Sequence, residues 1–259
     1  MLSGQGLPPE IPLPAGSETI TRVAVPRWPN RFYYLDTARM EVLVADGKGQ
    51  VLNRYGGWGS GPHALDLPIG LVAAENSVWV LDQAARKIVR LDSRLNPVAE
   101  LPLPDTGLPS YFVRDAWQRL WIASEQRPGL AIIDDMGRLV DRIGDGSGSA
   151  GLVQHPGLLA ADGDAVLVWD PVARELVTIA LSGTIARRTA LAIPGRVLAL
   201  APHAGGVALL TDQAVWRWAD GELVRAAENL HGWVDLVAHE GTLLALQPGK
   251  GLAPIAAPR

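Results

Sequence analysis

The sequence contains no cysteine and little lysine, and both features exclude classes of function. Without cysteine, the 259-residue chain forms no disulfide framework, holds no thiolate metal site or iron–sulfur cluster, and offers no cysteine nucleophile. Lysine occurs three times, and 23 Lys and Arg residues stand against 27 Asp and Glu residues, which gives a formal net charge of −4. This balance does not favour binding to nucleic acid or to an anionic membrane surface.

Long hydrophobic runs are also missing. The apolar stretches are interrupted by Gly, Asp or Arg, so none approaches the roughly 18 residues of a membrane-spanning helix. The tripeptide Leu2-Ser3-Gly4 resembles the residues that precede the acylated cysteine of bacterial lipoproteins, with Gln5 in the place of that cysteine. We therefore expect a natural precursor with a signal segment and a lipidated Cys at position 5. A chance match of a few residues is the alternative.

Turn-forming residues, in contrast, are plentiful. The chain has 28 Gly and 20 Pro, spread along its length between short apolar runs. One series of runs ends at residues 36, 82, 124, 170 and 212, with aspartate at each of these positions except Ser124. The spacings of 46, 42, 46 and 42 residues indicate an internal repeat of one supersecondary unit.

Each repeat contains four short apolar runs, several joined by Asp-Gly or Ser-Gly pairs that suit hairpin turns. Four antiparallel strands per repeat are typical of a β-propeller blade. The sequence therefore predicts a single all-β domain over residues 1–259, a six-bladed β-propeller of four-stranded antiparallel blades. The expected blades are 19–60, 61–104, 105–150, 151–191, 192–229 and 230–258. The last has three runs, so we expect an N-terminal strand within 9–15 to complete it and close the ring.

The second repeat resembles the NHL repeat. Its segments 63–72, 77–82 and 86–92 read HALDLPIGLV, SVWVLD and RKIVRLD, which are similar to the Pro-x-Gly-Leu, V-x-V-x-Asp and Arg-Ile strands of that family. The segment 154–177 matches next best, and the other repeats agree mainly in spacing and apolarity. The resemblance implies a six-bladed NHL-like propeller, a group that includes protein-binding scaffolds, RNA-binding modules and a few enzymes.

The repeated aspartates and the histidines are the polar residues that invite a chemical role. Because the aspartates recur at the same place in successive repeats, we expect them to accept hydrogen bonds from nearby backbone N–H groups in turns. His63 and His155 precede the innermost strands of the second and fourth blades, and His231 precedes the sixth, where all three can face the channel mouth. Three imidazoles on one rim could hold a metal ion. No ligand spacing supports that reading, so we expect no metal site.

Nine tryptophans are many for this length. Three fall in second strands and are expected to pack between blades: Trp79, Trp121 and Trp169. Others fall in turns or just before blades, where exposed indoles favour binding. Together with the rim histidines they give the candidate binding residues Trp58, His63, Trp117, His155, His231 and Trp233.

The sequence offers no convincing set of catalytic residues. It favours a non-catalytic NHL-like scaffold without a cofactor, which binds a protein partner through one face. If the precursor is lipidated, we expect an accessory subunit of a bacterial cell-envelope complex. It would be periplasmic or on the outer cell envelope, and the lipid would be its attachment to the membrane. Otherwise we expect a cytoplasmic protein. One alternative is a metal-dependent lactonase or hydrolase similar to the gluconolactonase family, but Glu18 lacks that family's flanking pattern. Another is a sugar- or peptide-binding module.

Overall fold

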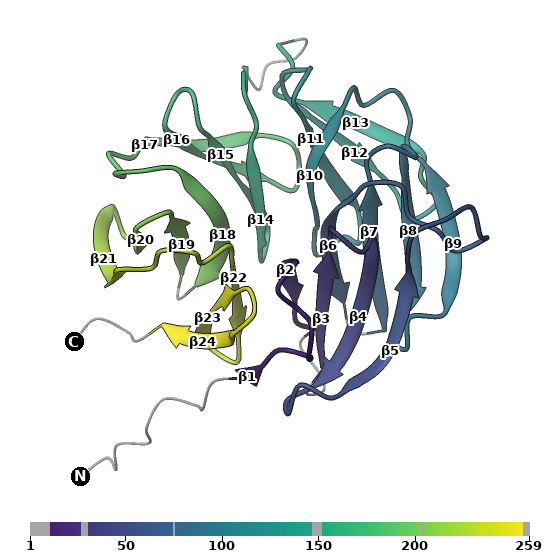
Figure 1. Ribbon diagram of the computed structural model, residues 1–259. Coiled ribbons are helices and arrows are strands. Elements are labelled where there is room, and N and C mark those ends of the chain that lie inside the picture. Colours follow the sequence, from purple (N-terminus) through teal and green to yellow (C-terminus); the bar gives the residue numbers. More distant parts are fainter. Residues whose placement is uncertain (1–10, 27–30, 75, 147–151, 204, 256–259) are drawn as a thin grey trace.

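The computed structural model describes residues 11–26, 31–74, 76–146, 152–203 and 205–255, and these form strands and turns without a helix. Six antiparallel sheets of four strands each surround a central axis (Figure 1). This confirms the predicted all-β architecture of six four-stranded blades. Within the described ranges, no helix is long and apolar enough to cross a membrane.

The strands of each blade follow one another from the centre of the ring outward. The first three blades consist of β2 (Ile20–Ala24), β3 (Arg31–Asp36), β4 (Glu41–Asp46) and β5 (Val51–Gly56); β6 (Pro68–Ala74), β7 (Ser77–Asp82), β8 (Lys87–Asp92) and β9 (Pro97–Pro102); and β10 (Pro109–Arg114), β11 (Leu120–Ser124), β12 (Leu130–Ile133) and β13 (Leu139–Ile143). The others consist of β14 (Leu158–Asp162), β15 (Ala165–Asp170), β16 (Glu175–Ala180) and β17 (Ile185–Ala190); β18 (Val197–His203), β19 (Gly206–Thr211), β20 (Ala214–Ala219) and β21 (Glu222–Glu228); and β22 (Asp235–His239), β23 (Thr242–Gln247), β24 (Gly251–Ile255) and β1 (Ile11–Pro12).

The outermost strand of the sixth blade comes from the opposite end of the chain. Strand β1 pairs antiparallel with β24, with Ile11 opposite Leu252 and Pro12 opposite Gly251 (Figure 1). Proline is tolerated at an edge strand because no further strand needs its missing N–H. Pairing between the two ends of the chain therefore closes the ring, as the three runs of the sixth repeat predict.

Gly251 permits this closure because a side chain at its position would meet β1. A Cβ atom on Gly251 would lie 2.6 Å from the carbonyl oxygen of Ile11. We expect Gly251→Ala to displace β1 and to lower the free energy of unfolding by about 1–3 kcal/mol, measured by urea denaturation. Gly61→Ala is the matched control, because a Cβ there meets no atom within 4 Å. Equal stability of the two variants would show that β1 does not close the ring tightly.

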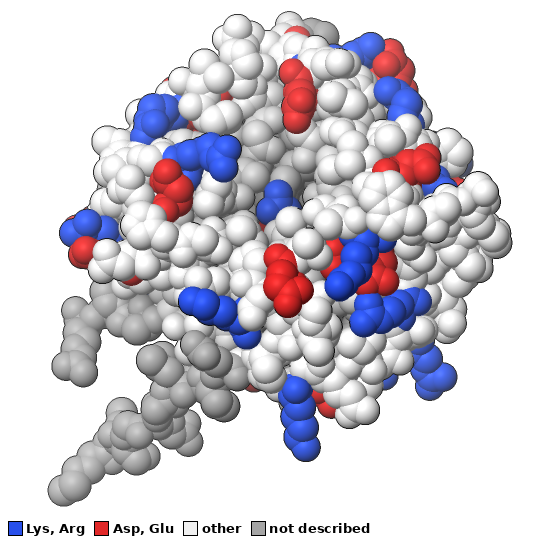
Figure 2. Space-filling view, in the orientation of Figure 1, with Lys and Arg blue, Asp and Glu red and all other residues white. Residues whose placement is uncertain are grey.

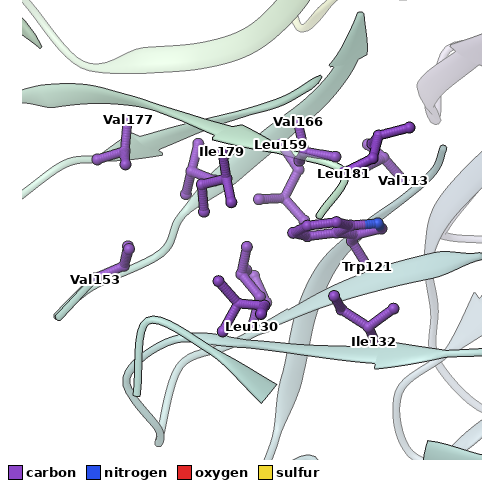
Figure 3. Close-up of a cluster of buried hydrophobic side chains, with 13 residues drawn as sticks. Val113, Trp121, Leu130, Ile132, Val153, Leu159, Val166, Val177, Ile179 and Leu181 are labelled. Atoms are coloured by element: carbon purple, nitrogen blue, oxygen red, sulfur yellow. The ribbon is translucent and has the colours of Figure 1, made fainter. Parts of the chain in front are cut away.

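The apolar core is divided among the junctions between blades. Six clusters of buried side chains are found among the described residues, and each joins one pair of neighbouring blades. Figure 3 shows the cluster between the third and fourth blades, in which Trp121 faces Leu159 and Val166. Trp79, Trp121 and Trp169 are 0%, 0% and 3% exposed, which confirms that they pack between blades. Strands covered on both faces explain why their runs are continuously apolar.

Aspartates at the ends of third strands stabilise the outer hairpins. The Oδ1 atom of Asp46 accepts the backbone N–H groups of Lys48 and Gln50, both at 2.9 Å. Asp92 and Asp134 accept the N–H groups two and four residues further on in the same way. The repeated aspartates at the ends of second strands also bind turn N–H groups: Asp36 accepts that of Arg39 at 3.0 Å and Asp170 that of Ala173 at 2.9 Å. This confirms the turn-forming role predicted for them.

Candidate functional site at the channel mouth

The two faces of the ring carry different connections. We call one the mouth face: the inner strands begin there, so it carries the connections between successive blades and the turns between second and third strands. Five predicted binding residues lie on blade-to-blade connections of this face: Trp58, His63, His155, His231 and Trp233. Trp117 lies in the turn between β10 and β11 and therefore on the opposite face.

The mouth face is hollowed where the inner strands begin. Two adjoining cavities of about 530 and 450 Å³ share Arg22, Arg196 and Val197. We call the two together the central hollow. Figure 2 shows a hollow at the centre of the ring, with basic surface inside it. The hollow thus combines positive charge with apolar strand residues.

Arg22 is the first of the two arginines that line both cavities of the hollow. Its Nη1 atom makes a long hydrogen bond to the carbonyl oxygen of Thr21 at 3.4 Å, and its guanidinium lies over the ring of Tyr111, 5.7 Å from the centroid. Its Nε atom is buried without a hydrogen-bond partner. The nearby Asp235 is buried and accepts the N–H of Val23 at 2.8 Å. Arg22 therefore has a carboxyl group in its surroundings but no direct ion pair with a described residue.

The electrostatic effects of Asp235 and Tyr111 keep Arg22 charged. Burial is the largest influence on the pKa of Arg22 and lowers it, but Asp235 and Tyr111 outweigh burial and raise the pKa overall. Burial raises the pKa of the Asp235 carboxyl, against the opposing effect of Arg22. Burial also raises the pKa of the Tyr111 hydroxyl to about 12. The hollow therefore holds a lasting positive charge beside a neutral phenol.

The aspartates at the ends of second strands position the rim of the hollow. Asp170 Oδ2 accepts the backbone N–H of His155 at 3.0 Å, and Asp212 Oδ1 accepts that of Arg196 at 3.2 Å. Asp82 accepts the backbone N–H groups of Asp66 and Leu67 in the same way. These two residues end the connection that carries Trp58 and His63 and leads into β6. Each of these bonds joins a blade-to-blade connection to the end of a second strand about 15 residues later in the chain. The aspartates therefore bind residues outside their own turns as well.

The three rim histidines do not converge. His155 lines the central hollow, whereas His231 lines a separate cavity of about 280 Å³ beside β20 and β21. His63 is exposed, and its ring lies 5.5 Å from that of Tyr55. Within the part of the chain that the structure describes, no group of three or more His, Asp or Glu side chains could hold a metal ion.

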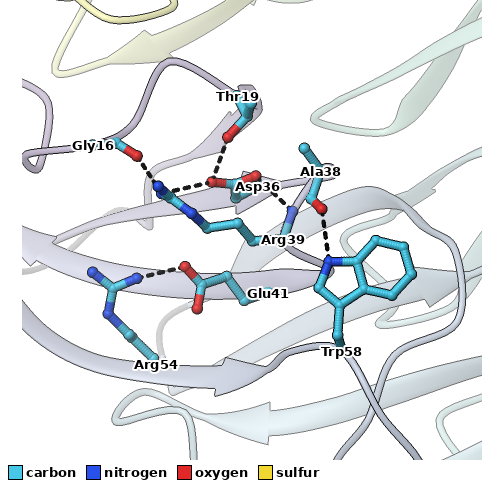
Figure 4. A network of polar contacts seen from close by, with 8 residues as sticks. All are labelled: Gly16, Thr19, Asp36, Ala38, Arg39, Glu41, Arg54 and Trp58. Atoms are coloured by element: carbon cyan, nitrogen blue, oxygen red, sulfur yellow. Dashed lines mark hydrogen bonds and ion pairs between the residues drawn. The ribbon is translucent and has the colours of Figure 1, made fainter.

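Trp58 is the most exposed large hydrophobic side chain of the described residues, at 75%. Its Nε1–H nevertheless donates to the carbonyl oxygen of Ala38 at 2.9 Å (Figure 4). The Ala38 turn is itself held, because Asp36 accepts the N–H of Arg39 at 3.0 Å and the hydroxyl of Thr19 at 2.8 Å. The indole is therefore fixed at the surface although it sits on a glycine-rich connection.

The other two candidate tryptophans have different surroundings. Trp117 is 59% exposed on the opposite face, and the guanidinium of Arg119 lies 4.5 Å from its ring centroid. Trp233 is partly buried and packs against the cluster between the fifth and sixth blades. Trp58 is thus the candidate tryptophan that combines exposure, fixation and a place on the mouth face.

Three charged residues of the site, Arg22, Arg196 and Asp235, were not predicted from the sequence. Arg22 and Asp235 lie in or at the start of the innermost strands β2 and β22, and Arg196 directly precedes β18. Because side chains alternate between the two faces of a strand, a charged residue in an inner strand does not by itself indicate a place in the channel.

No protein-family model matches the sequence, and no curated protein sequence matches it significantly. The predicted NHL identity therefore remains a prediction. The lipoprotein processing site does too, and residues 2–5 lie outside the described residues.

Solved structures are similar in fold. Selenomethionine-substituted virginiamycin B lyase from Staphylococcus aureus is 15% identical with a TM-score of 0.69, over 95% of this chain and 83% of that chain. A streptogramin B lyase structure is 13% identical with a TM-score of 0.67, over 96% and 97%. The β-propeller domain of Cps50 (Swd1) from Myceliophteria thermophila is 15% identical with a TM-score of 0.65, over 98% and 99%. At these identities, the likeness shows that the chain shares their propeller fold and no more.

Proposed function

We propose that this chain is a non-catalytic scaffold that binds a protein partner on its mouth face. The observation that carries the proposal is Trp58, which is 75% exposed and yet held by its bond to Ala38. An indole fixed before binding loses little conformational freedom when a partner covers it, and tryptophan is enriched among residues that dominate binding energies.

Further apolar side chains are exposed on the same face. Val172, Leu152 and Leu67 are 67%, 43% and 38% exposed on its connections and turns. They add apolar surface that a partner bound at Trp58 could cover. The resemblance of Leu2-Ser3-Gly4 to a lipoprotein processing site supports the second part of the proposal, that the chain is an accessory subunit of a bacterial cell-envelope complex.

A metal-dependent lactonase is supported less well by the same face. A hard cation needs several oxygen ligands, and the described residues bring no such group together. Arg22 also places a positive charge in the hollow where the cation of such an enzyme would lie. Turnover of a lactone panel by the purified chain, together with a bound metal ion in stoichiometric amount, would overturn the scaffold proposal.

Trp58→Ala tests the proposal, with Trp117→Ala as a matched control on the opposite face. We expect Trp58→Ala to weaken partner binding by at least about tenfold while the free energy of unfolding changes by less than about 0.5 kcal/mol. The partner is recovered by cross-linking in envelope extracts, identified by mass spectrometry, and titrated in purified form against each variant. Binding that survives Trp58→Ala but is lost in Trp117→Ala would place the interface on the other face.

A further inference from the structure

The central hollow contains positive charge that nothing in the described structure neutralises directly. Arg22 makes one long hydrogen bond and one ring contact, and its Nε atom is buried without a partner. Arg196 uses its backbone N–H to bind Asp212, and no ion pair to its guanidinium is found among the described residues. Both side chains line the same hollow. A guanidinium in such a site can form paired hydrogen bonds to an oxyanion.

Uncharged donors with no partner gather in the same place. The hydroxyl groups of Thr21 and Ser110 are buried and form no hydrogen bond with any described residue. Thr21 lines the first cavity of the hollow and Ser110 lines the second. Because buried polar groups in folded proteins are nearly always hydrogen-bonded, several orphan groups around one cavity indicate that a ligand or water completes them.

The rest of the wall indicates what else the ligand carries. Ile69, Leu198 and Val234 line the first cavity, and Val197 lies where the two cavities meet. Both volumes, about 530 and 450 Å³, fall in the range of small-molecule sites. Asp235 near Arg22 and Glu125 in the second cavity would repel a second negative charge. These features favour a ligand with one negative charge and an apolar body over a phosphate dianion.

We infer that the central hollow binds a carboxylate carried on an apolar body, with Arg22 and Arg196 holding the carboxylate and β6, β18 and Val234, just before β22, covering the body. The inference goes beyond protein docking through Trp58 and does not depend on it. Two sources can supply this chemistry: a free aliphatic carboxylic acid, or the C-terminal carboxylate of a hydrophobic peptide.

Calorimetric titration of the full chain tests both sources. The first pair of probes is octanoate and the uncharged octanamide; the second is an acetylated hydrophobic tripeptide with a free C-terminal carboxylate and its amide. We expect the carboxylate of at least one pair to bind at least about tenfold more tightly than its amide, as expected for hydrogen bonds to charged groups. Preference within the octanoate pair identifies a free acid, and preference within the peptide pair identifies a peptide end. Equal binding within both pairs would overturn the inference.

Variants tie the preference to the two arginines. Arg22→Met and Arg196→Met should each reduce the preference for carboxylate by about tenfold, and Ser110→Ala should reduce it less. Arg138→Met, in an exposed outer hairpin, is the control and should leave it unchanged. If Arg22→Met does not fold, Arg196→Met decides, because Arg196 is exposed. A preference that survives both substitutions, or that Arg138→Met removes equally, would contradict the assignment. Partner binding measured with Trp58→Ala is a separate readout and can fail without affecting this one.

Discussion

Replacing Trp121 with alanine is expected to lower the free energy of unfolding by about 3–5 kcal/mol, the usual cost of removing a buried indole. Trp121 is 0% exposed and lies in the cluster between the third and fourth blades (Figure 3). Its Nε1–H also donates to Asp115 Oδ2 at 2.7 Å. For a domain of this size, the melting temperature should fall by about 10 °C. Thermal and urea denaturation followed by circular dichroism measure both quantities.

Trp121→Phe separates packing from the hydrogen bond. Phenylalanine fills much of the cavity but leaves Asp115 without one donor, so we expect a loss of about 1–2 kcal/mol. Asp115 keeps the N–H and Nε–H bonds of Arg119, at 2.9 and 2.8 Å, which limits the cost. Trp117→Ala, with a 59% exposed indole only a few residues away, serves as the surface control. If Trp121→Ala cost no more than Trp117→Ala, blade packing would not depend on the second-strand tryptophans.

Much of the fold could be predicted because every blade of a propeller contains the same arrangement of strands. The runs ending at Asp36, Asp82 and Asp170 occupy the same place in their respective blades, so one pattern recurs often enough to be recognised. The incomplete sixth repeat then indicated the closing strand, because an open sheet edge is unfavourable. The pairing of Ile11 with Leu252 follows from that reasoning, although the described strand β1 is only two residues long.

The site was less predictable because it depends on convergence of all six blades. Thr21, Ile69, Ser110 and Val197 are far apart in the sequence and meet only because each begins an inner strand. Spacing along the chain predicts which residues start strands, but not which cavity they share. The histidines illustrate the limit: equivalent positions in the repeat placed His155 in the hollow, whereas His63 lies against Tyr55.

The repeated aspartates connect the predictable fold to the less predictable site. The sequence predicts that they bind nearby backbone N–H groups, and in the structure they also bind N–H groups about 15 residues earlier in the chain. Asp82 is 0% exposed and binds the Ala85 N–H in its own turn at 3.4 Å, but also the N–H groups of Asp66 and Leu67 at 3.0 and 2.9 Å. The residue that ends a second strand thus also holds the connection of the mouth face that leads into its blade.

Asp82→Ala is therefore expected to affect both stability and the mouth face. Removing the carboxylate leaves amide donors of Asp66 and Leu67 without their partner, which should cost about 3 kcal/mol in the free energy of unfolding. Asp82→Asn should be nearly as harmful, because both carboxylate oxygens accept N–H groups and an amide offers only one acceptor oxygen. Urea denaturation measures the loss, and hydrogen exchange should show faster exchange at the Asp66 and Leu67 amides.

Asp46→Ala separates this effect from the general loss of an aspartate turn. Asp46 also accepts two backbone N–H groups, from Lys48 and Gln50, but its hairpin is exposed and far from the mouth face. Water can replace an exposed acceptor, so we expect a loss below about 1 kcal/mol and no change in exchange at Asp66 or Leu67. If Asp46→Ala and Asp82→Ala were equally destabilising, both aspartates would act only as local turn formers. A larger loss in Asp82→Ala, with faster exchange before β6, would show that the repeat motif itself builds the face on which we place partner binding.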